Sequence, residues 1–337
     1  MLMMMNSNKM FFFFILFFST LISVSSNSWI GCWIGLEINL LSFIPLLTNP
    51  NNLMNSEASL KYFLTQSIAS INFLFSILIN MMIMKNFFMD NLMSMLINSS
   101  MLMKMGSTPF HFWFPNIVEG LSWLNCLILM TWQKISPMIL LSYYLNLKFL
   151  FFIMILNVLI GTISSFNQLS LRKLMAFSSI NNLGWLLSAL MISENLWMLY
   201  FLLYSFFIII MCFLFYITNI YYMNQLFNFN LNFYLKIFIF INFLSLGGLP
   251  PFLGFFPKWM IINYLLMNNL FIISFIFIMT SLIMMFIYIR IMYSSLLFQS
   301  IKLKWFKINI KNNFLILINL FSFISMLGMI MSTFIFF

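Results

Sequence analysis

The sequence predicts a polytopic α-helical membrane protein, mainly from its apolar content and its shortage of charge. Of the 337 residues, 64% are hydrophobic and only 6% are charged, whereas about a quarter of a soluble domain is charged. A helix needs roughly 20 apolar residues to cross a bilayer, so the apolar residues suffice for about ten or eleven spans. This composition excludes a soluble enzyme, a nucleic-acid-binding protein and a disordered chain.

Apolar runs bounded by proline, polar or charged residues divide the chain into eleven predicted spans within a single membrane domain, 1–337. The spans lie near residues 9–26, 28–47, 56–83, 91–118, 121–145, 148–166, 172–190, 194–223, 234–266, 269–298 and 312–336. Lys9 and the apolar run after it have the outline of a signal peptide. No small-residue cleavage site follows, however, and the next apolar run begins at Trp29. We therefore interpret this run as the first span.

The basic residues between the spans support the count of eleven. An eleven-span topology places ten of them on one side of the membrane and two, Lys85 and Lys148, on the other. The ten are Lys9, Lys61, Arg172, Lys173, Lys236, Arg290, Lys302, Lys304, Lys307 and Lys311. Because basic residues gather on the cytoplasmic or matrix side, we expect the N-terminus on that side and the C-terminus on the opposite one.

Four charged residues fall inside the predicted spans. Glu37 is at the centre of the second span, Lys104 at the centre of the fourth, Lys134 near the centre of the fifth, and Lys258 within the ninth. A lysine at the bilayer midplane costs roughly 2.5–3.5 kcal/mol even on the most lenient scale. Lysines near a span end can extend to the interface, but these positions are too deep for that. We interpret them as sites of proton or ion handling within the membrane.

The fourth and ninth spans are both interrupted by glycine and proline. The stretches Gly106-Ser-Thr-Pro-Phe-His-Phe-Trp-Phe-Pro115 and Gly248-Leu-Pro-Pro-Phe-Leu-Gly-Phe-Phe-Pro257 agree at five of ten positions with an offset of 142. Broken backbone at membrane depth persists only where it is buried in protein or borders a wet cavity. Two broken helices five spans apart run in opposite directions, which indicates an inverted-topology repeat with an ion path near its interface. Two unrelated proline kinks are the alternative.

The single histidine, His111, lies inside the first interruption. An imidazole there could relay protons near neutral pH. Alternatively, it could satisfy backbone groups that Pro109 and Pro115 leave unpaired.

No cofactor or metal is expected in this chain. The cysteines Cys32, Cys126 and Cys212 are far apart within apolar runs and form no CxxC or Cys/His cluster, so we interpret them as small buried hydrophobic residues. The sequence also has no nucleotide-binding glycine motif and no pair of histidines for haem.

Six stretches along almost the whole chain resemble the NADH dehydrogenase subunit 2 family, in an insect-like version. They are Gly35-Leu-Glu37-Ile-Asn-Leu40, Ser56-Glu57-Ala-Ser-Leu-Lys61-Tyr-Phe63, Pro109-Phe-His111-Phe-Trp-Phe-Pro115, Thr131-Trp-Gln-Lys134, Leu171-Arg-Lys-Leu-Met-Ala-Phe-Ser-Ser179-Ile180 and Gly247-Gly-Leu-Pro-Pro-Phe-Leu-Gly254. These proteins are the antiporter-like subunits of mitochondrial respiratory complex I. The resemblance implies their fold, with eleven helices in animals and fourteen in the bacterial relative.

The resemblance also implies roles for the charged residues within the spans. Glu37 is similar to the family's glutamate that pairs with a lysine on the first broken helix, here Lys104. Lys134 resembles the central-axis lysine and Lys258 the lysine of the second broken helix, so the resemblance implies a proton relay along these residues. One departure is Asn182, where many relatives have histidine. If that histidine carries protons, Asn182 and bound water must substitute for it here.

By resemblance, the chain is a core membrane-arm subunit of complex I in the mitochondrial inner membrane. Its N-terminus would face the matrix and its C-terminus the intermembrane space. The implied partners are other membrane-arm subunits and inner-membrane phospholipids such as cardiolipin, whose acidic headgroups could contact the lysines between residues 302 and 311. NADH, FMN, iron–sulfur clusters and ubiquinone would belong to other subunits. The alternatives are a free-standing cation/proton antiporter and a purely structural membrane anchor.

Overall fold

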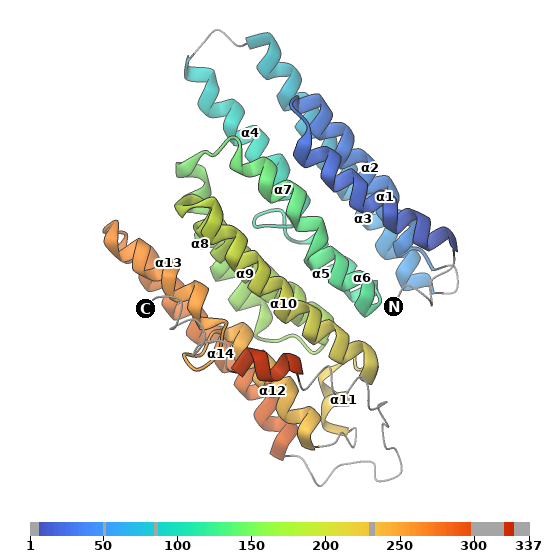
Figure 1. The fold of residues 1–337 in the computed structure, drawn as a ribbon, viewed down its shortest axis with the longest axis vertical. Helices are drawn as coiled ribbons and strands as arrows, with labels where there is room; N and C mark the ends of the chain where they lie inside the picture. The colour runs from blue at the N-terminus through green and yellow to red at the C-terminus, as the bar shows by residue number, and fades with distance from the viewer. Residues whose placement is uncertain (1–6, 50–51, 84–86, 229–232, 298–319, 327–337) are drawn as a thin grey trace. The chain divides into compact units, whose positions relative to one another are not determined.

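The computed structural model describes residues 7–49, 52–83, 87–228, 233–297 and 320–326. This part of the chain is almost entirely helical (Figure 1). Eight of its helices are long and apolar enough to cross a membrane, which establishes a multi-pass membrane protein. The predicted eleventh span, 312–336, and the lysines between residues 302 and 311 lie outside the described residues, apart from a helical stretch at 320–326.

The chain divides into two compact units, residues 1–153 and 154–337. Unit 1 contains α1 (Ser7–Ser25), α2 (Trp29–Leu47), α3 (Leu53–Ile83), α4 (Phe87–Met105), α5 (Trp113–Gly120), α6 (Trp123–Met130) and α7 (Trp132–Ser142). Helices α1 and α2 approach closely at Gly35, where a Cβ atom would lie 2.7 Å from the backbone nitrogen of Ser23. This close approach is typical of small residues between membrane helices.

Unit 2 contains most of α8 (Leu147–Ser165), followed by five long helices and one short helix. These are α9 (Leu171–Ile192), α10 (Glu194–Thr218), α11 (Met223–Asn228), α12 (Phe233–Gly247), α13 (Phe255–Met267) and α14 (Phe271–Leu297). Every residue of α9 from Leu174 to Leu190 is buried. A helix that is buried on all sides forms the core of its unit, and α9 therefore has this position in unit 2.

The order of elements in unit 1 recurs in unit 2. Three boundaries return 142 positions later: the start of α2 in the start of α9, the end of α4 in the end of α12, and the start of α5 in the start of α13. This is the offset found between the glycine- and proline-containing stretches of the sequence. The repeat predicted from ten residues therefore extends over several helices.

The first predicted break is present between α4 and α5, and a glycine produces it. Gly106 has φ of +71°, a left-handed conformation that glycine adopts without steric cost. Its N–H donates to the carbonyl of Met103 (3.2 Å), and the N–H of Ser107 donates to that of Leu102 (3.1 Å). These two bonds form a Schellman motif, which ends a helix by pairing its last carbonyls.

The second predicted break, between α12 and α13, uses the same cap. Gly248 has φ of +86°, and its N–H donates to the carbonyl of Ser245 (3.1 Å). The N–H of Leu249 donates to the carbonyl of Leu244 (3.3 Å). Both units therefore stop their broken helix with the same local geometry.

A third interruption, which the sequence did not predict, divides the fifth span into α6 and α7 at Thr131. This residue has φ of −113° and ψ of −73°, and its hydroxyl donates to the carbonyl of Leu127 (2.7 Å). Hydroxyl bonds of this kind to the preceding turn often bend helices. In addition, Pro137 within α7 has no N–H to donate to the preceding turn. The interruption lies three residues before Lys134.

Candidate functional site

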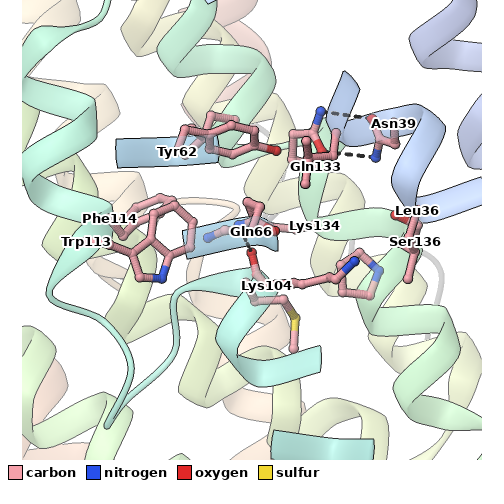
Figure 2. Close-up of a pocket in the computed structure, with 14 residues that line it drawn as sticks. Leu36, Asn39, Tyr62, Gln66, Lys104, Trp113, Phe114, Gln133, Lys134 and Ser136 are labelled. Carbon is pink, nitrogen blue, oxygen red and sulfur yellow. Dashed lines mark hydrogen bonds between the residues drawn. The ribbon is translucent and has the colours of Figure 1, made fainter. Parts of the chain in front are cut away.

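Two of the predicted lysines, Lys104 and Lys134, line one cavity in unit 1 (Figure 2). Lys104 comes from the last turn of α4 and Lys134 from the first turn of α7. Only 7% and 1% of their surfaces are exposed. The cavity has an empty volume of about 410 Å³, and the space inside it suits about one water molecule. The structure thus places two buried amines on one small polar space.

Amide side chains line the same cavity and hold its walls together. Asn39 of α2 and Gln133 of α7 form two reciprocal hydrogen bonds of 3.0 and 3.1 Å, shown as dashed lines in Figure 2. Gln66 of α3 donates to the backbone carbonyl of Lys104 at 3.0 Å. A carbonyl in the last turn of a helix has no partner within that helix. Gln66 therefore satisfies a group that the helix break leaves unpaired.

Glu37 lies on α2, next to the cavity-lining residue Leu36, and its side chain is partly exposed. Its carboxylate exerts an electrostatic attraction on Lys104. Among the described residues, however, the ion pair within 4.0 Å is between Lys61 and Glu57 on the exposed face of α3, and Glu37 forms none. Direct or water-mediated pairing of Glu37 with Lys104 stays a prediction.

Lys134 contacts the second half of the broken helix. Its Nζ lies 5.5 Å from the centre of the Phe114 ring on α5, which is within the range of a cation–π interaction. Phe114 also packs against the cap, because a Cβ added to Gly106 would lie 2.9 Å from the Cβ of Phe114. The ring thus connects the helix break to the ammonium group of Lys134.

In unit 2, Lys258 reaches back across the break to the end of α12. Its Nζ donates to the carbonyls of Leu246 (3.2 Å) and Gly247 (2.8 Å) and lies 5.5 Å from the centre of the Trp185 ring. The C-terminal end of a helix carries unpaired carbonyls and the negative pole of its dipole, both of which favour a cation. Leu246 corresponds to Lys104 at the repeat offset, so each unit has a lysine at the end of its first half-helix.

A second cavity lies beside Lys258 and has an empty volume of about 260 Å³. Its lining includes Asn182 of α9 and the tyrosines Tyr200 and Tyr204 of α10. The hydroxyl of Tyr200 donates to Oδ1 of Asn182 at 3.3 Å. The position at which the sequence departs from its family therefore borders the lysine of the second broken helix.

His111 is buried in the first break, but it is not among the residues that line the unit 1 cavity. Its ring packs on Phe112 at 4.3 Å between centroids, and the backbone of Pro109 interacts with it. Its Nδ1 has no hydrogen-bond partner within the described part of the chain. The interaction with Pro109 agrees with a backbone-satisfying role, and a relay role stays a prediction.

Sequence reasoning missed a fourth buried lysine and the polar residues around the lysines. Lys236, assigned to a connection between spans, lies in the first turn of α12 and is only 3% exposed. Apolar residues on both sides of it in the sequence are the signal that could have indicated burial. Gln66 and the Asn39–Gln133 pair carried no comparable signal.

Two repeated units, each with a glycine-capped broken helix and buried lysines, define an antiporter-like multi-pass membrane protein. Residues 26–284 match the family model described as the transmembrane region of NADH:quinone oxidoreductase and Mrp antiporters. Proteins named NADH-ubiquinone oxidoreductase chain 2 are similar over 93% of this chain in Anopheles gambiae (49% identity) and over 94% in Aedes aegypti (50% identity). These matches cover 93% and 94% of the relatives. The chain therefore belongs to the NADH-ubiquinone oxidoreductase chain 2 family.

Solved structures share the fold. A chain of respiratory complex I from Thermus thermophilus has a TM-score of 0.82 and 18% identity, with 97% of this chain and 79% of that chain covered. A chain of the Mrp complex from a Dietzia species has a TM-score of 0.70 and 13% identity, with 82% and 58% covered. At these identities the likeness concerns the fold, which agrees with the predicted antiporter-like architecture.

Proposed function

We propose that this chain translocates protons as a membrane-arm subunit of a respiratory NADH:ubiquinone oxidoreductase, with Lys104, Lys134 and Lys258 as its proton-carrying groups. The observation that carries the proposal is the unit 1 cavity, on which Lys104 and Lys134 both border at a helix break. Membership of the chain 2 family supplies the reaction to which this transport is coupled.

The cavity has the chemistry that proton transfer between two lysines requires. Burial disfavours the charged form of an amine, whereas a nearby carboxylate favours it. Lys104 experiences both influences, because it is buried and attracted by Glu37. One water molecule on the shared cavity could then accept a proton from one amine while donating to the other. Lys258, bonded to the end of α12, has the corresponding role in unit 2.

The redox chemistry is assigned to other subunits, together with NADH, FMN, iron–sulfur clusters and ubiquinone. The sequence supports this assignment, because its single histidine and three separated cysteines offer no ligand cluster. The free energy for transport would then reach this chain through its contacts with neighbouring membrane-arm subunits. We further propose the mitochondrial inner membrane as its location, with the N-terminus on the matrix side, contacts with phospholipids such as cardiolipin, and no nucleic-acid partner.

Substitution of the cavity lysines in the assembled complex tests the proposal. Lys104→Met and Lys134→Met keep the apolar stem and remove the amine. Removing a proton-transfer group typically lowers a rate by about 10²–10⁴, so proton uptake by proteoliposomes that contain the variant complex should fall at least about tenfold. Lys61→Met is the matched control, because Lys61 lies on an exposed face of α3. A normal ratio of protons to electrons in Lys134→Met would contradict the proposal.

A free-standing cation/proton antiporter is the second candidate, since the fold is shared with the Mrp complex. The chain 2 relatives at 49% and 50% identity favour the first candidate. Purification in mild detergent separates the two. A complex I subunit should elute in an assembly of many chains with NADH oxidation activity, whereas a free antiporter should elute without it.

A further inference from the structure

We propose that Tyr200, oriented by Asn182, holds the water molecule through which Lys258 gains and loses its proton. This inference rests on the proposed function and extends it to two residues outside the lysine set. It concerns the cavity of unit 2, whose lining includes all three residues.

The hydroxyl of Tyr200 has a fixed direction. Tyr200 and Asn182 are only 3% and 5% exposed, and the Tyr200 hydroxyl donates to Oδ1 of Asn182 at 3.3 Å. A phenol oxygen has one hydrogen to donate and can also accept hydrogen bonds. Because its hydrogen is directed to Asn182, Tyr200 can act towards the cavity only as an acceptor. Asn182 is therefore a positioning residue for Tyr200.

Lys258 presents a donor to the same cavity. An ammonium group has three N–H donors, and two of them bind the carbonyls of Leu246 and Gly247. The third has no acceptor among the described residues, while Lys258 lines the cavity. The remaining donor of Lys258 and the acceptor of Tyr200 thus border one small space.

A water molecule fits between this donor and this acceptor. The space suits about one water, which needs at least two polar partners to be held in a buried site. Lys258 would donate to the oxygen of this water, and the water would donate one of its hydrogens to Tyr200. The third partner is a further water molecule at the mouth of the cavity, to which the second hydrogen is directed.

The proton transfer through this water is balanced. The ammonium of Lys258 gives one proton to the held water as that water gives one of its own protons to the further water. Lys258 becomes a neutral amine, the positive charge leaves with the further water, and Tyr200 neither gains nor loses a proton. The reverse steps reload Lys258.

A double-mutant cycle in the assembled complex tests the arrangement. Tyr200→Phe removes the acceptor, and Asn182→Leu removes the group that orients it. Each change should slow proton uptake by proteoliposomes about threefold to tenfold, as expected for one hydrogen bond. Residues that act through one contact are not additive, so the double variant should be no slower than the slower single variant. The solvent deuterium isotope effect on uptake should rise in both, which a merely structural defect would not cause.

Two further variants complete the design. Tyr288→Phe is the matched control, because its hydroxyl bonds to Ser178 of α9 and the residue does not line the cavity; its uptake and isotope effect should be normal. Lys258→Met separates the two levels of the proposal. If Lys258→Met blocks uptake while Tyr200→Phe leaves uptake and isotope effect normal, the inference is overturned and the proposed function stands. If Lys258→Met itself pumps normally, the proposed role of Lys258 fails.

Assembly is measured for each variant on native gels. Should Tyr200→Phe fail to assemble, Asn182→Leu decides the question alone, since it leaves the tyrosine ring in place and removes only the acceptor of its hydrogen. Normal uptake and a normal isotope effect in assembled Asn182→Leu would then overturn the inference.

Discussion

Replacing Gly248 by alanine should damage the second helix break and the lysine that binds to it. Gly248 has φ of +86°, a left-handed conformation that costs a non-glycine residue about 1–2 kcal/mol. The new Cβ would also lie 3.0 Å from Cδ and 3.3 Å from Nζ of Lys258. The lysine side chain is flexible and can move, but only by disturbing its bonds to the carbonyls of Leu246 and Gly247.

The two effects have different magnitudes and different consequences. Backbone strain of about 1–2 kcal/mol shifts the equilibrium of the capped break about 5- to 30-fold towards the uncapped form. Hydrogen bonds that involve a charged group contribute about 1.5–3 kcal/mol each, so displacing Lys258 from one carbonyl is at least as costly. We therefore expect less assembled complex, and at least about fivefold slower proton uptake by the complex that does assemble.

The assay compares Gly248→Ala with Gly248→Asn. Asparagine tolerates the left-handed conformation better than alanine, yet it introduces the same Cβ beside Lys258. Assembly on native gels should recover in Gly248→Asn, whereas proton uptake per assembled complex should stay low. If Gly248→Ala assembles and pumps as the unmodified complex does, the account of the cap and its lysine is wrong.

Three further substitutions test other contacts. Glu37→Gln keeps the size of the side chain and removes the charge that attracts Lys104, so the complex should assemble normally and pump more slowly; normal pumping would refute the pairing. Gln66→Leu leaves the buried carbonyl of Lys104 without its donor, which costs about 1–3 kcal/mol, and should lower the thermal unfolding temperature of the complex; an unchanged temperature would contradict this. Gly184→Ala would place a Cβ 2.3 Å from Cγ2 of Val158, and overpacking of about 1–3 kcal/mol should reduce the amount of assembled subunit on native gels; a normal amount would show that α8 and α9 can separate without cost.

The helix breaks could be predicted from the sequence because their causes are local. A glycine that ends a helix and prolines that prevent its continuation act within a few residues, and the structure confirms both breaks at Gly106 and Gly248. The burial of Lys104, Lys134 and Lys258 was also accessible, since a charge in the middle of an apolar run must be enclosed by protein.

The polar surroundings of the lysines could not be predicted, because they depend on packing between distant segments. Asn39 and Gln133 are 94 residues apart in the chain, and no periodic pattern indicates that they pair. Thr131 interrupts its span through a side-chain bond to its own backbone, a choice that competes with a regular helix only in a particular context. Lys236 was misassigned because its position near a span end fits an interfacial lysine as well as a buried one.

The two units show why a lysine can serve the same purpose from either side of a helix break. Lys104 precedes its break, and Lys258 follows the equivalent one. Lys258 nevertheless donates to the carbonyl of Leu246, the residue that corresponds to Lys104 in the repeat. In an apolar interior, the end of a broken helix is among the few places with unpaired carbonyls and a negative dipole pole. The stabilised position of the ammonium is therefore set by the helix end, and the residue that delivers it can come from either half.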